Sequence, residues 1–167
     1  MEKSELTQER LHELLHYNLR TGTFRWRVRK RSNQRAGDIA GFRTRSDYWR
    51  IRVDGRYYRA HQLAWLYMTG EWGRPLVDHR DGNPLNNRWG NLRVASHTNN
   101  AANRRRLQGK ASGFKGVSFD RRSGKWFAQI AKDGRRYWLG YFKTPQEAHR
   151  AYATAARLLF GKFARME

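Results

Sequence analysis

Short amphipathic segments alternate with turn residues from the start of the chain. Leucines recur there at helical spacing after Thr7, a good helix N-cap, and Glu9 lies in the first turn, where a negative charge is favourable. We therefore expect a short helix, followed by a strand in which Phe24, Trp26 and Val28 alternate with arginines. The leucines of the predicted helix are Leu6, Leu11, Leu14, Leu15 and Leu19.

A β-hairpin and a second helix are predicted next. Residues 48–53 and 56–59 flank an Asp-Gly pair, which tolerates the positive φ angles of a type I′ turn. The mostly apolar run at residues 60–68 then predicts a helix that ends at a Thr-Gly pair and packs beneath the strands. His61 lies at the start of this helix. We interpret it as a core or capping histidine in preference to a ligand.

The central part of the chain predicts a strand, a long polar loop, a second strand and a helix. The apolar residues 75–77 lead into Asp78 and His79, and strong turn chemistry follows them. Residues 92–95 form the returning strand, and Ser96 is a good N-cap for the helix after it. Because Asp78 and His79 are adjacent, they share one site only where the strand ends or twists.

Three strands and one helix are predicted for the rest of the chain. The strands cover residues 114–119, 125–131 and 135–142 and are separated by turn residues. Thr144, Pro145 and Glu147 mark the start of the helix as N-cap, first position and capping box. One face of that helix carries small and apolar residues that let it lie close to the sheet, namely Ala148, Ala151, Tyr152, Ala155 and Leu159.

These elements predict an α+β fold made of small modules. Residues 1–74 form an N-terminal α/β segment with a β-hairpin, and residues 75–106 form the central unit. Residues 107–112 form a linker, and residues 113–167 form a three-stranded antiparallel sheet packed on one helix.

Composition points to a polyanionic partner. Lys and Arg number 35 against 14 Asp and Glu, so the formal net charge is +21 and the pI is about 11.3. The alternative explanation of this charge is a basic surface that is merely hydrated, as in many structural RNA binders. The absence of cysteine excludes disulfides and thiolate zinc sites, so any metal takes oxygen or imidazole ligands. No apolar run approaches a membrane span and no signal peptide pattern begins the chain, so we expect a cytoplasmic protein without a membrane partner.

Asp78, His79 and Asn100 carry the chemistry that the sequence offers. Hydrolysis of a phosphodiester needs charge neutralised on the phosphate and a water molecule deprotonated. A carboxylate and an amide oxygen suit a hard divalent cation such as Mg²⁺, and a neutral imidazole accepts the proton. The alternative reading makes Asp78 and His79 turn residues and the asparagines helix caps.

The stretch DHRDGNPLNNRWGNLRVASHTNN resembles the HNH (ββα-metal) motif of phage and intron-encoded homing endonucleases. By that resemblance His79 is the general base, Asp78 and Asn100 are metal ligands for Mg²⁺ or Mn²⁺, and Asn91 has a structural role in orienting the base. The family carries Asn or His at the position of Asn100. His97 is interpreted as an exposed helix histidine, with a spare ligand or a DNA contact as the alternatives.

A second resemblance covers most of residues 112–163. The stretch GFKGVSFDRRSGKWFAQIAKDGRRYWLGYFKTPQEAHRAYATAARLLFG is similar to an AP2 DNA-binding domain, whose three-stranded sheet lies in the major groove of double-stranded DNA. The resemblance implies four DNA-facing residues, Lys115, Gln129, Arg136 and Trp138. Trp126 stays open between contact and core. The chain departs from plant AP2 domains at Ser118, Asp120 and Ala131, where those domains place arginines.

Strand alternation by itself leaves Lys115, Lys125 and Arg136 on solvent-facing positions, from which they can reach phosphates. Arg104 and Arg105, in a basic triplet before the linker, are further candidates for DNA contact. These residues extend the expected DNA interface beyond the catalytic unit.

We therefore predict a metal-dependent DNA endonuclease of the HNH type that hydrolyses double-stranded DNA in the cytoplasm of a bacterial or phage-infected cell. One active site cuts one strand, so we expect a monomer to nick, and a double-strand break to need a DNA-induced dimer or two successive events. We expect a divalent cation and no small-molecule cofactor. The alternatives are a non-catalytic AP2-like transcriptional regulator and a structural RNA binder.

Overall fold

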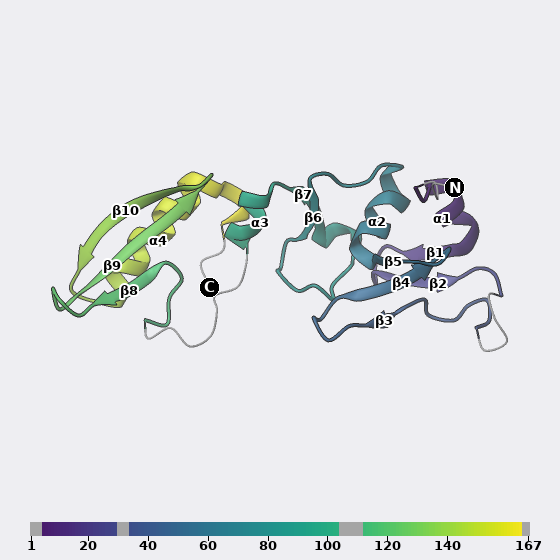
Figure 1. Cartoon of the computed structure of the whole chain (residues 1–167), viewed down its shortest axis with the longest axis horizontal. Helices are drawn as coiled ribbons and strands as arrows, with labels where there is room; N and C mark the ends of the chain where they lie inside the picture. Colours follow the sequence, from purple (N-terminus) through teal and green to yellow (C-terminus); the bar gives the residue numbers. More distant parts are fainter. Residues whose placement is uncertain (1–4, 30–33, 104–111, 165–167) are drawn as a thin grey trace. The chain divides into compact units, whose positions relative to one another are not determined.

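The computed structural model describes residues 5–29, 34–103 and 112–164 (Figure 1). The chain divides into two compact units, residues 1–95 and residues 96–167. The predicted α+β fold is confirmed at this level, because helices and antiparallel sheets occur in both units. Within the described residues no helix is long and apolar enough to cross a membrane.

The first unit begins with helix α1 (Gln8–Leu14), and Thr7 is its N-cap, as predicted. The Thr7 hydroxyl accepts a hydrogen bond from the Arg10 N–H at 3.3 Å. The prediction that the helix continues to Leu19 is wrong. Leu15 adopts extended backbone and begins strand β1 (Leu15–Asn18), which pairs with β2 (Thr23–Trp26), while Leu19 is exposed.

The predicted hairpin and second helix follow in the same unit. Strands β3 (Phe42–Arg43), β4 (Trp49–Val53) and β5 (Arg56–Arg59) form one antiparallel sheet. Asp54 and Gly55 both have positive φ, at 44° and 86°, as the predicted type I′ turn requires. Helix α2 (Ala60–Thr69) comes next, and Gly70 ends it in the left-handed conformation.

A two-stranded sheet completes the first unit. Strands β6 (Leu76–His79) and β7 (Leu92–Ala95) are antiparallel, and the short 3₁₀ helix η1 (Trp89–Asn91) leads into β7. Val77 and Leu92 belong to the core that also contains Leu11, Ile51 and Leu63. The hairpin that carries Asp78 and His79 is therefore anchored on the main apolar core of this unit.

The second unit contains α3 (His97–Asn103), β8 (Val117–Asp120), β9 (Lys125–Lys132), β10 (Arg135–Phe142), α4 (Pro145–Phe160) and η2 (Gly161–Phe163). Within the described residues its sheet has the order β10-β9-β8, and α4 lies along one face of it (Figure 1). The predicted capping box of α4 is confirmed, since Thr144 and Glu147 exchange both hydrogen bonds.

One strand of this sheet starts later than predicted. Residues 114–116 are not in a strand, and β8 begins at Val117. Gly116 has φ 71°, and a Cβ at this position would lie 2.2 Å from the Tyr152 ring. The close approach of the chain to α4 therefore delays regular strand geometry until Val117, although the Gly116 carbonyl already accepts a hydrogen bond from the Gln129 N–H at 2.9 Å. Trp126, which the sequence left open between DNA contact and core, is partly buried and packs against the core of this unit.

The division between the units falls between β7 and α3, inside the segment 75–106 that we predict as one catalytic unit. Ala102 of α3 belongs to the second core, with Ile130 and Phe160. The predicted domain bounds stay a prediction, and almost all of the predicted linker at residues 107–112 lies outside the described residues.

Candidate active site and nucleic-acid interface

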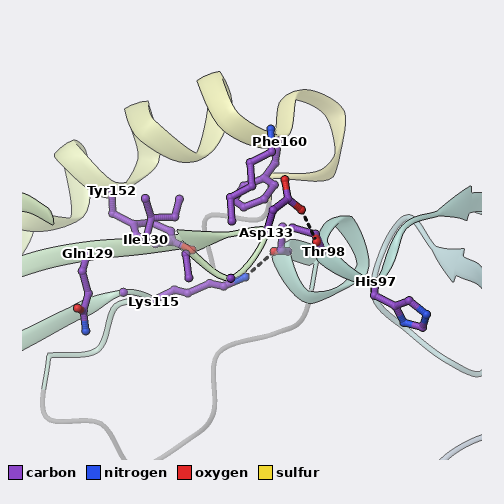
Figure 2. Close-up of a pocket in the computed structure, with 13 residues that line it drawn as sticks. His97, Thr98, Lys115, Gln129, Ile130, Asp133, Tyr152 and Phe160 are labelled. Atoms are coloured by element: carbon purple, nitrogen blue, oxygen red, sulfur yellow. Dashed lines mark hydrogen bonds between the residues drawn. The ribbon is translucent and has the colours of Figure 1, made fainter. Parts of the chain in front are cut away.

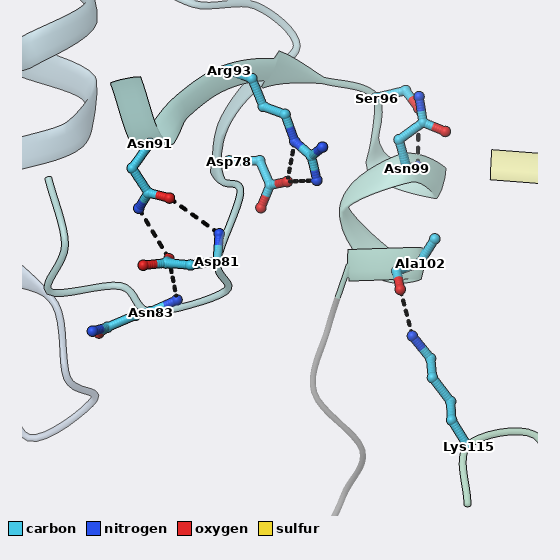
Figure 3. A network of polar contacts seen from close by, with 9 residues as sticks. All are labelled: Asp78, Asp81, Asn83, Asn91, Arg93, Ser96, Asn99, Ala102 and Lys115. Atoms are coloured by element: carbon cyan, nitrogen blue, oxygen red, sulfur yellow. Dashed lines mark hydrogen bonds and ion pairs between the residues drawn. The ribbon is translucent and has the colours of Figure 1, made fainter. Parts of the chain in front are cut away.

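The β6–β7 hairpin buries a carboxylate against a guanidinium. Asp78 faces Arg93 across the two strands, and each residue is only 6% exposed. Arg93 donates from Nε and Nη2 to the Asp78 Oδ2 atom at 3.1 and 3.0 Å (Figure 3). A buried charge needs such a partner, so Arg93 fixes the orientation of the Asp78 carboxylate.

His79, the next residue of β6, is also buried, at 6% exposed. Its Nε2 lies 3.1 Å from Oδ1 of Asn87, and the Asn87 Nδ2 donates to the Leu85 carbonyl. A carboxamide oxygen only accepts, so the Nε2 carries the hydrogen and the lone pair of the ring is on Nδ1. Asn87 thus selects the tautomer of His79 and holds its ring.

A second imidazole packs against this one. The ring of His61, on the first turn of α2, meets the His79 ring edge-on with 4.7 Å between centroids. Burial, together with the smaller effects of the neighbouring His79 and Arg59, lowers the pKa of His61 to about 3. Burial also lowers the pKa of His79, and Asn87, Asp81 and Asp78 oppose this only partly. Both rings are therefore neutral near pH 7.

The loop after His79 is held by a network of amides around Asp81 (Figure 3). The Asn91 Nδ2 donates to the Asp81 carboxylate and to the Asn86 carbonyl, and the Asn91 Oδ1 accepts from the Asp81 N–H. Partial burial opposes ionisation of Asp81, but hydrogen bonds from Asn83, Asn86 and Asn91 hold its pKa below the ordinary value. Asn91 thereby ties the loop back to the start of β7.

Asn100, the other candidate metal ligand, is half-buried on α3 of the second unit. The predicted N-cap of this helix is confirmed, because the Ser96 hydroxyl accepts from the Asn99 N–H at 3.1 Å (Figure 3). His97 is exposed, as we expected. Asp78, His79 and Asn91 thus lie together on the hairpin and its loop, while the position of Asn100 is set by α3.

The face of the β8–β10 sheet away from α4 carries most of the predicted DNA-facing residues. Gln129 is directly opposite Trp138, and Arg136 is opposite Ala131, so these residues share a face. Lys125, Arg136 and Trp138 are exposed and Gln129 is half-buried. This face is aromatic as well as basic. The centroid of the Phe127 ring lies 5.2 Å from that of Trp138 and 6.4 Å from that of Tyr141.

Lys115 does not lie on the solvent-facing side of a strand, as strand alternation predicts. Its ammonium donates to the Ala102 carbonyl of α3, the side chain is half-buried, and the residue precedes β8 (Figure 2). The prediction of a solvent-facing lysine is wrong, because the turn at Gly116 directs this segment towards α3. Lys115 lines a hollow of about 530 Å³ beside α3, together with Tyr152 and Phe160. Thr98 closes one side with a 2.7 Å hydrogen bond to Asp133.

Arg104 and Arg105, the remaining candidates for DNA contact, lie outside the described residues. The sequence did not reveal the roles of Asn87 and Arg93, nor the contact between the rings of His61 and His79. Asn87 occurs in an asparagine-rich turn, where its residue type does not distinguish it from a capping residue. Arg93 was detectable only with the strand register, which places it opposite Asp78.

Two family models match the chain, and both agree with the observed elements. The model of the HNH endonuclease matches residues 58–102, which include α2 and the β6–β7 hairpin, and the model of the AP2 domain matches residues 112–162. The chain belongs to the HNH endonuclease family and combines this domain with an AP2 domain. The resemblances found in the sequence are thereby confirmed.

A curated phage protein shows how far the likeness extends. Protein 3.8 of Escherichia phage T7 is 33% identical over 108 residues, which cover 57% of this chain and 88% of that protein. Dehydration-responsive element-binding protein 2A of Arabidopsis thaliana is 47% identical over 55 residues, and ethylene-responsive transcription factor ERF084 of the same plant is 49% identical over 59. The chain spans only 16% and 23% of these two plant proteins. No solved structure matches the chain.

Proposed function

We propose that this protein is a metal-dependent endonuclease that hydrolyses phosphodiester bonds of double-stranded DNA. His79 is the general base, Asp78 and Asn100 hold the divalent cation, and the open face of the β8–β10 sheet holds the duplex. The observation that carries the proposal is the fixed, neutral imidazole of His79, held by Asn87 beside a buried carboxylate. A neutral imidazole in one fixed tautomer and position is what a general base requires.

The base chemistry follows from the tautomer. With its hydrogen on Nε2, His79 presents the Nδ1 lone pair, which takes a proton from the attacking water. The lowered pKa keeps the ring unprotonated at neutral pH. As the proton arrives, the Asn87 carbonyl oxygen stabilises the resulting imidazolium through the same Nε2–H hydrogen bond. General-base catalysis of this kind contributes about 10²- to 10⁴-fold in rate.

The donor atoms suit a hard divalent cation. Among the described residues, no group of three or more His, Cys, Asp and Glu side chains could hold a metal ion. The candidate set is one carboxylate, Asp78, and one amide oxygen, Asn100, which fits Mg²⁺ or Mn²⁺, because Mg²⁺ usually keeps several waters and takes one or two carboxylates. When bound, the cation neutralises charge on the phosphate and on the leaving oxygen. Arg93 holds the Asp78 carboxylate in a fixed orientation for this role.

The open face of the β8–β10 sheet binds the duplex. Lys125 and Arg136 reach phosphates, and Gln129 and Trp138 face the groove. The products carry a 5′ phosphate and a 3′ hydroxyl. One site cuts one strand, so the monomer nicks, and a double-strand break requires a dimer formed on the DNA or two successive events.

The experiment incubates supercoiled plasmid with wild type, His79→Ala and His16→Ala in Mg²⁺, Mn²⁺ or EDTA. His16 is the matched control because it is an exposed histidine of the first unit. Wild type and His16→Ala nick the plasmid with either metal and not in EDTA, and His79→Ala is at least about 100-fold slower. Equal nicking by His79→Ala contradicts the proposal.

A second experiment tests the role of Asn100 in metal binding. Asn100→Ala raises the Mg²⁺ concentration needed for half-maximal nicking, whereas Asn99→Ala, one residue earlier on the same helix, leaves it unchanged. Identical metal dependence of the two variants removes Asn100 from the ligand set while leaving the assignment of His79 intact.

A non-catalytic AP2-like regulator is the second candidate, favoured by the likeness of residues 112–162 to plant transcription factors. It predicts tight binding to duplex DNA with wild type and His79→Ala equally inert in the nicking assay. Tight binding to structured RNA, with none to duplex DNA, favours instead a structural RNA binder.

A further inference from the structure

The outer face of the β3–β4–β5 sheet in the first unit carries arginines and aromatic rings, and of these only Arg59, which neighbours His61, bears on the site described above. Ile51 and Val53 of β4 point into the core, so the alternate residues point outwards. The outward residues are all exposed, namely Phe42, Arg50, Arg52, Tyr57 and Arg59. We call this set the arginine face.

Two charges of the arginine face, those of Arg50 and Arg59, lie next to each other. Arg50 is directly opposite Arg59 in the register of β4 and β5, and like charges in that position repel. Within residues 5–29, 34–103 and 112–164, neither arginine forms an ion pair. The nearby carboxylate of Asp54 is engaged by Arg10 at 3.0 Å. The face therefore concentrates positive charge that an external anion can neutralise.

Aromatic rings lie between these charges. The Phe42 and Tyr57 rings meet edge-on at 5.9 Å, and both side chains are about half exposed, at 49% and 55%. The Arg52 guanidinium lies 5.6 Å from the Tyr57 ring centroid. Both rings line a hollow of about 410 Å³, together with Trp26 and Ile39. The hollow is large enough for a small planar group, and Arg52 and Asp54 also line it.

We propose that the arginine face binds unpaired, single-stranded DNA, with the arginines on phosphates and with a base stacked on Phe42 or Tyr57. Cationic side chains interleaved with exposed aromatic rings are the combination that binds single strands, because each base of an unpaired strand exposes its flat face. In a duplex these faces are stacked on one another. The inference rests on the proposed function, in which a nuclease of this kind opens or nicks one strand of its duplex.

The test measures the fluorescence anisotropy of a labelled oligo-dT and of a labelled hairpin duplex of equal length, in EDTA. Wild type is compared with Phe42→Ala, Tyr57→Ala and the Arg50→Gln/Arg59→Gln double variant. Each aromatic variant weakens oligo-dT binding about 5- to 150-fold, and the double variant lowers the slope of log K against log salt by about 1.4. Duplex binding changes less than twofold.

Matched controls separate this effect from general charge and from misfolding. Arg20→Gln removes an exposed arginine of the β1–β2 turn and leaves oligo-dT binding unchanged, and Trp138→Ala on the AP2 sheet weakens duplex binding instead. Melting temperatures identify any variant that fails to fold, and the half-exposed positions of Phe42 and Tyr57 also accept Phe42→Leu and Tyr57→Leu as replacements.

Unchanged oligo-dT affinity in folded aromatic variants overturns the inference. An equal loss of oligo-dT and duplex binding also overturns it, since the face would then be a general phosphate contact. The measurement needs no cleavage and no metal, so it gives its answer even if the chain proves to have no nuclease activity.

Discussion

The β6–β7 hairpin and the open face of the β8–β10 sheet use polar groups in opposite ways. In the hairpin, Asp78 and His79 are buried, and each accepts or shares a hydrogen bond with a side chain on the same hairpin or its loop. On the sheet, Arg136 and Trp138 are exposed. The contrast indicates that the first region is built to fix a few atoms for chemistry, and the second to present a surface to a large ligand.

The largest effect is expected where the hairpin loses its buried cation. Arg93→Met leaves the Asp78 carboxylate buried without its partner and lowers the free energy of unfolding by about 3–5 kcal/mol, as measured by urea denaturation. Arg93→Lys keeps the charge and loses the two-bond geometry, so its loss is smaller. Equal stability of Arg93→Met and wild type shows that the pair does not organise the hairpin.

Asn87→Leu sharpens the comparison on the catalytic side. The change removes the acceptor of the His79 Nε2–H, so the ring loses its fixed tautomer and position, and the nicking rate falls by about 100-fold. Asn86→Leu, one residue earlier, is the control, because Asn86 contacts Asp81 and not His79. The measurement compares the single-turnover nicking rates of the two variants. Equal rates would show that Asn87 does not position His79.

The pH dependence of stability separates the buried site from the exposed face. His61 remains neutral in the folded chain down to about pH 3, while in the unfolded chain it binds a proton below about pH 6.5. Lowering the pH through this window therefore favours unfolding, by about 1.4 kcal/mol per pH unit. His61→Gln removes that slope in urea titrations at several pH values. A variant with the wild-type slope contradicts the buried, neutral state of His61.

The smallest effect is expected on the open face. Arg136→Gln removes one exposed phosphate contact and weakens duplex binding about fivefold, with the salt slope lowered by about 1 and the stability unchanged. Arg157→Gln on α4 is the control, since this exposed arginine lies on the helix and not on the sheet. Equal duplex affinity of Arg136→Gln and Arg157→Gln removes the open face as the duplex-binding surface.

Local chemistry made much of the fold predictable. The Thr144 and Glu147 capping box and the Asp54-Gly55 turn depend on residues close in sequence, and both were found as predicted. The end of α1 was not predictable in this way. Leu15 continues the helical pattern of leucines in the sequence. It nevertheless begins strand β1, because it pairs with Trp26, eleven residues further on.

The same distinction holds for the candidate site. Asp78, His79 and Asn91 could be found because the HNH resemblance rests on residue type and spacing. Asn87, Arg93 and His61 required the register of β6 and β7 and the packing of α2, which no short pattern encodes. Lys115 was misplaced for a related reason, since its partner is a backbone carbonyl of α3.

Chemical rescue tests the central claim most directly. His79→Gly removes the proposed base and leaves a cavity beside Asn87, and imidazole added to the nicking assay supplies the missing group from solution. The proposal predicts that His79→Gly is inactive in Mg²⁺ alone and that nicking returns in proportion to the concentration of neutral imidazole, as the pH is varied. Nicking by His79→Gly at the wild-type rate without imidazole would contradict the assignment of His79 as the base.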